Sequence, residues 1–391
     1  MATAVRNTPL RDCHARWGAK FTEFGGWEMP VRYKGIVHEH KHTRSAVSLF
    51  DTCHMGAFLL KGSRARDDVA RLISSAVERI RVWGCRYGLL LNEAGGILDD
   101  VIAYCLEEDA YMLVVNASTT ERDAEWVRDY LSPGTAFHDV SEETAKIDVQ
   151  GPRSLEVLSD WTDIPIRQLA YFHFQRGKLW EFEVLLSRTG YTGELGYELY
   201  AAPSAVETIW TRLLEHPLVE PAGLGARDTL RLEMGYPLYG QDMDERRTPL
   251  EAGLARYVAW NKDFIGRDAL LRQRAEGIPQ SLVGLLLEGR RAARHGFPIL
   301  RDGIRCGEVT SGSFAPSLGR AVSLGYVPWA HRAPGTRFEI LSGRRTLRAE
   351  VVALPFYKKG TVRTRTAIDT YASSKKAVPF SGGMGGGFIE Y

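Results

Sequence analysis

The first two thirds of the chain alternate short apolar runs with amphipathic stretches. The runs have the length of buried strands and are bounded by polar turns that contain glycine. The amphipathic stretches repeat their apolar residues with a helical period. We interpret as strands residues 89–91, 101–104, 111–115 and 147–150, and as helices residues 64–75, 117–131, 153–158, 203–216 and 223–235. This alternation predicts an α+β body with mixed sheets.

The pattern changes near Leu282 to short β runs broken by glycine and proline. The runs that we interpret as strands are residues 282–287, 307–311, 321–327, 336–340 and 346–352. Their spacing of roughly ten residues predicts a small all-β barrel or sandwich. The pattern ends after Lys359, and the glycine-rich residues 361–391 cannot form a fold alone.

The length of the chain predicts more than one domain, because 391 residues are too many for one compact core. We expect a body over residues 1–275, built from two interleaved α+β subdomains with boundaries near residues 50 and 145. A C-terminal β-barrel domain should follow over residues 280–360. Residues 361–391 should form a flexible tail.

Charge and cysteine content exclude several classes of partner. The net charge of +2 creates no field that would attract nucleic acid or a membrane surface. No apolar run approaches the ~20 residues that span a bilayer. The five cysteines are scattered and include no C-x-x-C pair, which favours reduced thiols over a disulfide frame or a zinc site. We therefore expect a cytoplasmic protein that binds neither nucleic acid nor membrane.

The stretch from Tyr87 to Tyr104 carries the most informative chemistry. Two apolar strands flank Asn-Glu-Ala-Gly-Gly, a hairpin-type turn in which glycine can take positive φ. Adjacent carboxylates, Asp99 and Asp100, stand at the mouth of the second strand. Neighbouring strand residues point to opposite faces, so only one of the two can face a pocket beside the turn. From this stretch alone, the alternative remains that both carboxylates are simply exposed to solvent at the turn.

A second glycine-rich loop runs from Arg188 to Gly196 and can pass close to a ligand. It leads into a strand where Tyr197 and Glu198 face opposite ways. In the predicted helix 223–235, Arg227 and Arg231 share a face. The spacing of Asp228 and Arg231 also permits a simple surface ion pair.

Three histidines at residues 38, 40 and 42 raise the question of a metal site. Only His38 and His42 lie on one helical face at this spacing. We interpret the stretch as a solvated helix start and expect no metal.

Sequence blocks across nine-tenths of the chain resemble the aminomethyltransferase (T-protein) family of the glycine cleavage system. Many blocks occur in the family's order, and so many in register are highly specific. They include Phe24-Gly-Gly-Trp-x-Met-Pro30, Phe50-Asp-x-x-His54-Met55, Asn92-Glu-x-Gly-Gly-Ile-Leu-Asp-Asp100, Val-Val-Asn116-Ala-Ser, Gln150-Gly-Pro, Thr189-Gly-Tyr-Thr-Gly-Glu194, Ala226-Arg-Asp-x-Leu-Arg-Leu-Glu-x-Gly235, Phe264-Ile-Gly-Arg, Thr310-Ser-Gly-x-x-x-Pro-Ser-Leu and Gly325-Tyr-Val-Pro328.

The resemblance implies a three-domain cloverleaf around a central folate pocket, with the β-barrel as its third lobe. It also implies a reaction with a lipoyl carrier protein, the H-protein, as partner. An aminomethyl group on the lipoyl sulfur gives its carbon to N5 of tetrahydrofolate. Ammonia leaves, and 5,10-methylenetetrahydrofolate and the reduced lipoyl arm are the products.

The resemblance also assigns the acidic residues. Asp100 takes the catalytic position, where a carboxylate can orient N5 and stabilise developing positive charge, while Asp99 points away. The pterin ring offers a guanidine-like edge of donors that suits a carboxylate. Glu198 matches the family's residue there, and Glu194 is the less favoured choice.

Five further residues complete the expected pocket. By family position, Met55 and Tyr191 should cover ring faces, and Tyr87 and Asn116 should line the pocket. Arg227 matches the family's folate-contacting arginine.

Two positions depart from the family pattern within the matched region. Arg256 stands where a tryptophan is common, and Cys53 stands where serine is usual. Relatives of the family diverge on the substrate side, so Arg256 keeps open the alternative of a tetrahydrofolate-dependent demethylase that takes a methyl group from a sulfonium or aryl ether. A non-catalytic folate-binding accessory protein is another, although the Lys-Gly-Cys-x-x-Gly-Gln segment of that branch is absent.

Overall fold

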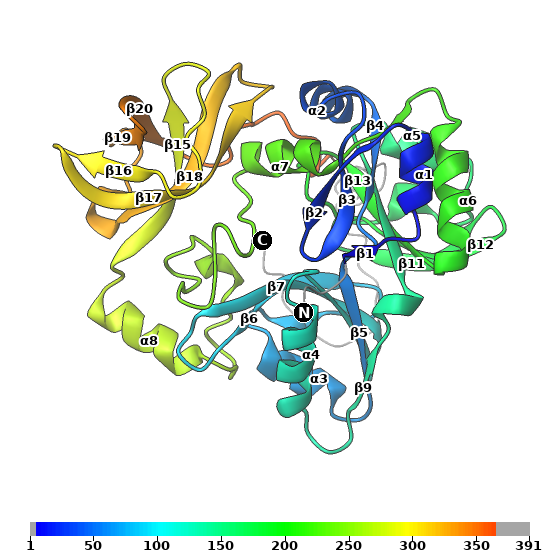
Figure 1. Ribbon diagram of the computed structural model, residues 1–391. Coiled ribbons are helices and arrows are strands. Elements are labelled where there is room, and N and C mark those ends of the chain that lie inside the picture. Colours follow the sequence, from blue (N-terminus) through cyan, green and yellow to red (C-terminus); the bar gives the residue numbers. More distant parts are fainter. Residues whose placement is uncertain (1–4, 365–391) are drawn as a thin grey trace, which may run out of the picture.

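Three lobes surround the centre of the molecule in the computed structural model, which describes residues 5–364 (Figure 1). Two lobes form the α+β body and the third is a β-barrel. The fold is therefore the three-lobed cloverleaf that the family resemblance implies. The expected tail falls mostly on residues 365–391, which lie outside the described residues.

The lower lobe in Figure 1 is a five-stranded sheet of order β6-β7-β8-β5-β9. Its strands are β5 (Gly56–Lys61), β6 (Cys85–Leu91), β7 (Ile97–Glu107), β8 (Ala110–Val115) and β9 (Ala136–Asp139). Two helices, α3 (Ala65–Leu72) and α4 (Thr120–Asp129), bury apolar side chains against it, including Val69 and Val127. The hairpin β6–β7 carries Asp99 and Asp100 inside a longer strand than the predicted 101–104.

The upper right lobe contains a six-stranded sheet of order β11-β12-β13-β10-β4-β14. Its strands are β4 (Val47–Asp51), β10 (Ala145–Gln150), β11 (Phe174–Leu179), β12 (Phe182–Ser187), β13 (Gly196–Ala201) and β14 (Val219–Pro221). The helices α1 (Arg11–Arg16), α5 (Ser154–Leu158) and α6 (Pro203–Leu214) belong to the same lobe. The chain crosses between the two sheets at residues 52–55, from β4 to β5.

A small sheet and two helices also belong to this lobe. The sheet has the order β1-β3-β2. Its members and the helices beside it are β1 (Arg6–Asn7), β2 (Lys20–Phe24), β3 (Trp27–Arg32), α2 (Ile36–Ser45) and α7 (Leu224–Glu233).

The C-terminal lobe is a closed barrel of order β15-β18-β17-β16-β19-β20, so the barrel alternative is correct and the sandwich is not. Its strands are β15 (Gln280–Leu287), β16 (Pro298–Arg301), β17 (Ile304–Ala315), β18 (Arg320–Pro328), β19 (Arg337–Ser342) and β20 (Arg345–Val352). Helix α8 (Arg267–Glu276) precedes the barrel. Short 3₁₀ turns are η1 (Val77–Arg79), η2 (Ser141–Glu143), η3 (Ile166–Gln168), η4 (Ala255–Tyr257) and η5 (Trp329–His331).

Arg231 joins α7 to the barrel. Its ion pair with Asp228 is therefore not the simple surface pair that the sequence spacing permits. Its guanidinium is buried and donates to Asp228, but also to Asp242 at 2.7 Å and to the Ser311 hydroxyl of β17 at 2.9 Å. A charged group survives burial only when partners satisfy it, and these acceptors do so. Arg231 is thus a structural residue.

Helix α4 begins later than the predicted residue 117, and the reason bears on the site. The hydroxyl of Thr119, the N-cap residue, makes no cap hydrogen bond to the helix and instead donates to Asp99 Oδ2 at 3.0 Å. The turn before the helix therefore binds the Asp99 carboxylate of β7. Among residues 5–364, no helix combines the length and apolar character needed to cross a membrane.

Candidate functional site

The turn between β6 and β7 needs both of its glycines, for different reasons. Gly95 has φ +82°, which favours glycine. Gly96 lies so close to the Glu245 carbonyl oxygen that a Cβ there would be 1.8 Å from it. The Asn92 side chain accepts a hydrogen bond from the Gly96 amide and fixes the turn. The hairpin therefore packs against the loop that contains residue 245 and presents β7 in one register.

The two adjacent carboxylates share one donor, Asn116 Nδ2, but differ in their exposure to solvent. Asp99 is fully buried and accepts hydrogen bonds from the Asn116 backbone and side chain and from Thr119. Asp100 keeps partial solvent access and accepts a hydrogen bond from Asn116 Nδ2 at 2.8 Å. Asp99 thus holds structure, and Asp100 is the carboxylate with capacity left for a ligand.

The surroundings of Asp100 favour its protonated form. Burial among protein atoms and the charge of Asp99 raise the pKa of Asp100 to about 7, although hydrogen bonds from Asn116 and Tyr87 oppose them. Behind the pair, burial and the same Asp99 charge raise the pKa of Asp123 to about 9. A carboxyl group poised near pH 7 is suited to proton transfer or to stabilising positive charge.

Glu198 lies on β13 within a dense buried network. One oxygen accepts a hydrogen bond from Lys146 Nζ at 2.9 Å. The other accepts from the hydroxyls of Thr189, Tyr104 and Tyr200 at 2.8–3.2 Å. Both oxygens of Glu198 therefore already accept hydrogen bonds. A ligand that donates to Glu198 must share one of these oxygens or displace one of the hydroxyls. The tyrosines can give way, because each can donate to the other's oxygen, 2.9 Å away.

Arg227 contacts Asp148 and the ring of Tyr191. It donates to Asp148 Oδ2 at 2.6 Å, and its guanidinium lies 5.0 Å from the ring centre of Tyr191. Burial raises the pKa of the Tyr191 hydroxyl, and the charge of Asp100 adds to that effect while Arg227 opposes it. Tyr191 is therefore in contact with Arg227, and the charge of Asp100 also acts on its hydroxyl.

The two remaining predicted residues border the same region. The Tyr87 ring packs edge-on to Tyr257 at 4.6 Å, and the charge of Asp100 raises the Tyr87 pKa in addition to burial. Met55 packs on the cluster that contains Tyr104 and Tyr200 and also lines a cavity of about 260 Å³ next to the small sheet.

Solvent access separates the predicted residues into two groups. Six keep partial exposure although they lie among buried neighbours, namely Met55, Tyr87, Asp100, Asn116, Tyr191 and Arg227. Glu198 is buried. Glu194, the less favoured acid, is buried instead in ion pairing with Arg44 at 2.9 Å and in a hydrogen bond with Thr361.

Sequence reasoning missed Lys146 and Asp148, which join Glu198 to Arg227. Lys146 Nζ donates to Asp148 Oδ1 at 2.7 Å as well as to Glu198. A usable signal was present, because β10 reads Ala-Lys-Ile-Asp-Val-Gln with all six residues buried. Polar residues at every second position of a buried strand share one face and need polar partners there.

The departures from the family pattern have small local consequences. Cys53 Sγ donates to the Lys146 carbonyl at 3.2 Å, a bond that a serine hydroxyl would also make. Arg256 is exposed, and its guanidinium lies 4.8 Å from the ring centre of Tyr257. Arg256 thus contacts Tyr257, and it is Tyr257 that packs against Tyr87.

Comparison with known proteins gives consistent matches along the chain. The family model described as the GCVT N-terminal domain matches residues 10–262, and the glycine cleavage T-protein C-terminal barrel domain matches residues 280–358. A protein named aminomethyltransferase from Halothermothrix orenii is 44% identical over 90% of this chain and 100% of its own length. Another of that name from Desulforamulus reducens is 40% identical over 91% and 99%.

A solved structure extends the similarity to three dimensions. The crystal structure of glycine cleavage system aminomethyltransferase T from Bartonella henselae superposes with a TM-score of 0.87 at 32% identity. It covers 92% of this chain and 99% of the other.

Proposed function

Because the chain belongs to the glycine cleavage T-protein family of aminomethyltransferases, we propose that its central residues perform that family's one-carbon transfer to tetrahydrofolate. The protein is an aminomethyltransferase of the glycine cleavage system. The donor is the aminomethyl-lipoyl arm of the H-protein. The products are 5,10-methylenetetrahydrofolate, ammonia and the reduced lipoyl arm.

The observation that supports this assignment best is the asymmetry of the carboxylate pair. Asn116 holds both carboxylates, yet only Asp100 keeps solvent access and room for another hydrogen bond. When N5 of the substrate attacks the aminomethyl carbon, the nitrogen gains positive charge. An ionised Asp100 stabilises that charge at short range in a site with little water.

Recognition of the pterin falls to the network on β10 and β13. Glu198 offers a carboxylate to the guanidine-like edge, and Lys146 fixes the orientation of that carboxylate. Tyr191 and Met55 cover the ring faces, and Tyr87 and Asn116 line the wall. Arg227, held by Asp148, presents a cation to the carbonyl-rich or anionic parts of folate.

The aminomethyl donor is favoured over the alternatives. The named relatives match along nearly their full lengths and are aminomethyltransferases. Arg256, which kept the demethylase alternative open, is exposed, and its guanidinium lies over the ring of Tyr257. The five cysteines are all free thiols, which supports a cytoplasmic setting for the reaction.

One assay tests the function directly. Purified protein is incubated with tetrahydrofolate and either aminomethylated H-protein or a methylated sulfonium or aryl ether. We expect methylenetetrahydrofolate and ammonia from the first donor and no methyltetrahydrofolate from the second. Methyltetrahydrofolate as the main product would overturn the assignment in favour of the demethylase, and folate binding without turnover of either donor would favour the accessory protein.

A further inference from the structure

His38 and His42 of α2 lie beside Glu220 of β14, on the side of the body away from the hairpin. The two imidazole rings stack with their centres 6.2 Å apart and an angle of 15° between planes. His38 Nε2 lies 2.7 Å from Glu220 Oε2, and His42 Nδ1 lies 3.9 Å from the same oxygen. One ligand atom from each residue lies within 4.8 Å of the others. Helix α2 therefore presents both rings to one carboxylate.

The backbone sets the tautomer of His42 in the way that a metal ligand requires. His42 Nε2 lies 3.0 Å from the Val47 carbonyl and 3.1 Å from the Leu218 carbonyl. Carbonyl oxygens only accept, so Nε2 carries the hydrogen, and the lone pair of the neutral ring is on Nδ1. That lone pair faces Glu220. A histidine that donates its other N–H to a backbone carbonyl is the usual outer-shell arrangement of a metal site.

The residues from His38 to His42 also have the H-E-x-x-H spacing, which in some proteins marks a hydrolytic zinc centre. The structure excludes that role for Glu39. Its buried carboxylate accepts hydrogen bonds from the backbone amides of Tyr33, Gly35 and Gly223. Glu39 ties down the start of α2 and cannot serve as a general base beside the histidines.

We propose that His38, His42 and Glu220 bind one Zn²⁺ ion, with water at the fourth position. Two imidazoles and a carboxylate form a recurrent zinc ligand set. In a tetrahedral site with bonds of about 2.0–2.1 Å, ligand atoms stand roughly 3.3 Å apart. The His38 side chain is 50% exposed, so its ring has room to rotate toward this geometry. The ion would link α2 to β14.

Lys34 is the competitor already present at the site. Its ammonium lies 2.8 Å from Glu220 Oε1, and its side chain is 58% exposed. It occupies the oxygen that faces away from the histidines, so it weakens the carboxylate as a ligand without blocking the position of the ion. Its removal should therefore tighten zinc binding.

The test is calorimetric titration of ZnCl₂ into the full chain, produced without a histidine tag and stripped with a chelator. The variants are His38→Ala, Lys34→Ala and, as a matched control, His138→Ala, an exposed histidine on β9. We expect one site per chain. His38→Ala should weaken binding by more than about 100-fold, beyond the 10–100-fold cost of losing an outer-shell partner. His138→Ala should bind as the parent does, and Lys34→Ala more tightly.

Thermal unfolding separates loss of the site from loss of the fold. Without zinc, His38→Ala should unfold at the same temperature as the parent, because its side chain is half exposed. With zinc, only proteins that keep the site should be stabilised. No zinc binding by the parent chain, or equal binding by His38→Ala, would overturn the proposal. Aminomethyl transfer should be unaffected by His38→Ala, so this result is independent of the proposed function.

Discussion

Asn116 Nδ2 donates to Asp100 Oδ1 at 2.8 Å. The same nitrogen lies 2.7 Å from Asp99 Oδ1, so one amide clamps a buried carboxylate and a partly exposed one. Asp99 also receives the Asn116 backbone N–H, which fixes the asparagine in place. The position of Asp100 is therefore set by hydrogen bonds before any substrate binds, and this preorganisation is what charge stabilisation in a transition state requires.

Replacing Asp100 by asparagine should remove the charge while keeping the shape. We expect turnover to fall by about 10²- to 10⁴-fold, the range for loss of an acid–base group. Folate affinity should stay largely intact, because Glu198 and Arg227 are untouched. Steady-state kinetics and folate titration provide the two measurements, with circular dichroism as a check on the fold. Unchanged turnover would remove Asp100 from the mechanism.

The raised pKa of Asp100 predicts a pH dependence of activity. The carboxylate is the form that stabilises positive charge, and it is populated only as pH rises through about 7. We expect kcat/KM to increase with pH and to level off above that value, with an apparent pKa that belongs to the coupled pair. In Asp99→Asn this rise of kcat/KM should move to lower pH, because the negative charge of Asp99 no longer raises the pKa of Asp100. If kcat/KM of Asp100→Asn still rose with pH through about 7, the rise would belong to another group.

The same shift has a consequence for stability. The folded-state pKa of Asp100 lies above its ordinary value of 3.8, so the fold prefers the protonated group. This contribution is fully present below about pH 3.8 and is lost as pH rises through about 7. Relative to the parent, Asp100→Asn should therefore gain in free energy of unfolding as pH rises from about 4 to about 7, and the difference should then stay constant. Denaturant titrations across that range measure the difference, and parallel curves would contradict it.

Glu198→Ala should weaken folate binding more than it affects turnover of bound substrate. Loss of a hydrogen bond to a charged group costs about 1.5–3 kcal/mol, or roughly 10- to 100-fold in Kd. Glu198→Gln should cost less, because the amide oxygen still accepts a hydrogen bond from Lys146. Tyr104→Phe should have a small effect on Kd, since the hydroxyls of Thr189 and Tyr200 continue to engage the carboxylate. An unchanged Kd in Glu198→Ala would place the pterin anchor elsewhere.

Much of the fold was readable in the sequence because its signals are local. The hairpin turn, the alternation along β7 and the apolar stripes of α6 and α7 follow from periods of two and 3.6 residues. The blocks that resemble the T-protein family then assigned Asp100 and its neighbours by position. In the structure Asp99 is buried and Asp100 keeps solvent access, and the catalytic role of Asp100 stays a prediction.

The rest depends on contacts between distant segments. Lys146 and Glu198 are 52 residues apart and meet only because β10 pairs with β13. Arg231 is buried rather than exposed because β17 supplies Ser311, 80 residues further along the chain. The approach of Glu220 to His38 likewise arises from the parallel pairing of β14 with β4. Local periodicity carries no information about such pairings.

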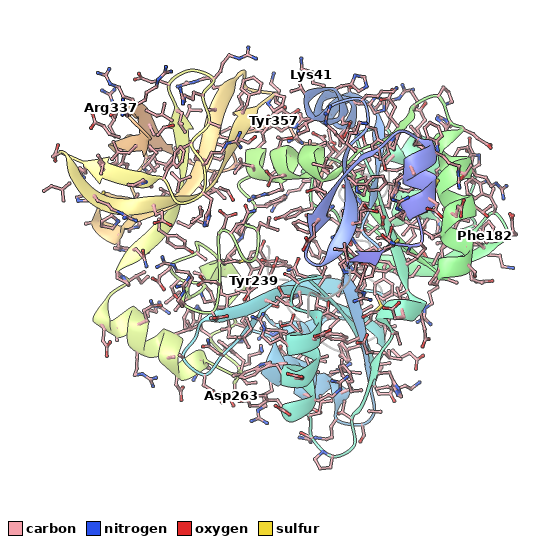
Figure 2. All side chains as sticks on the ribbon, in the orientation of Figure 1. Lys41, Phe182, Tyr239, Asp263, Arg337 and Tyr357 are labelled. Carbon is pink, nitrogen blue, oxygen red and sulfur yellow. The ribbon has the colours of Figure 1, made fainter. Side chains whose placement is uncertain are left out.

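Arg44 joins the α+β body to the segment that follows the barrel. Its buried guanidinium pairs with Glu194 and Glu233, each at 2.9 Å, and lies 4.2 Å from the ring centre of Tyr357. Tyr357 follows the barrel and lies at the junction of that lobe with α7 (Figure 2). Arg44→Met would leave two buried carboxylates without their cation, so we expect a loss of about 3–5 kcal/mol in the free energy of unfolding.

Arg16→Met is the matched control, because Arg16 makes an exposed ion pair with Glu207. Such surface pairs are worth about 0–1 kcal/mol. Urea unfolding of both variants gives the comparison, and hydrogen exchange at the Thr361 amide, which donates to Glu194, reports locally on the C-terminal segment. If the two methionine variants lost equal stability, the buried pairs of Arg44 would not hold the segment after the barrel to the body. If only Arg44→Met were destabilised and exchange at Thr361 rose with it, the arginine would be the point at which that segment is fixed beside the glycine loop.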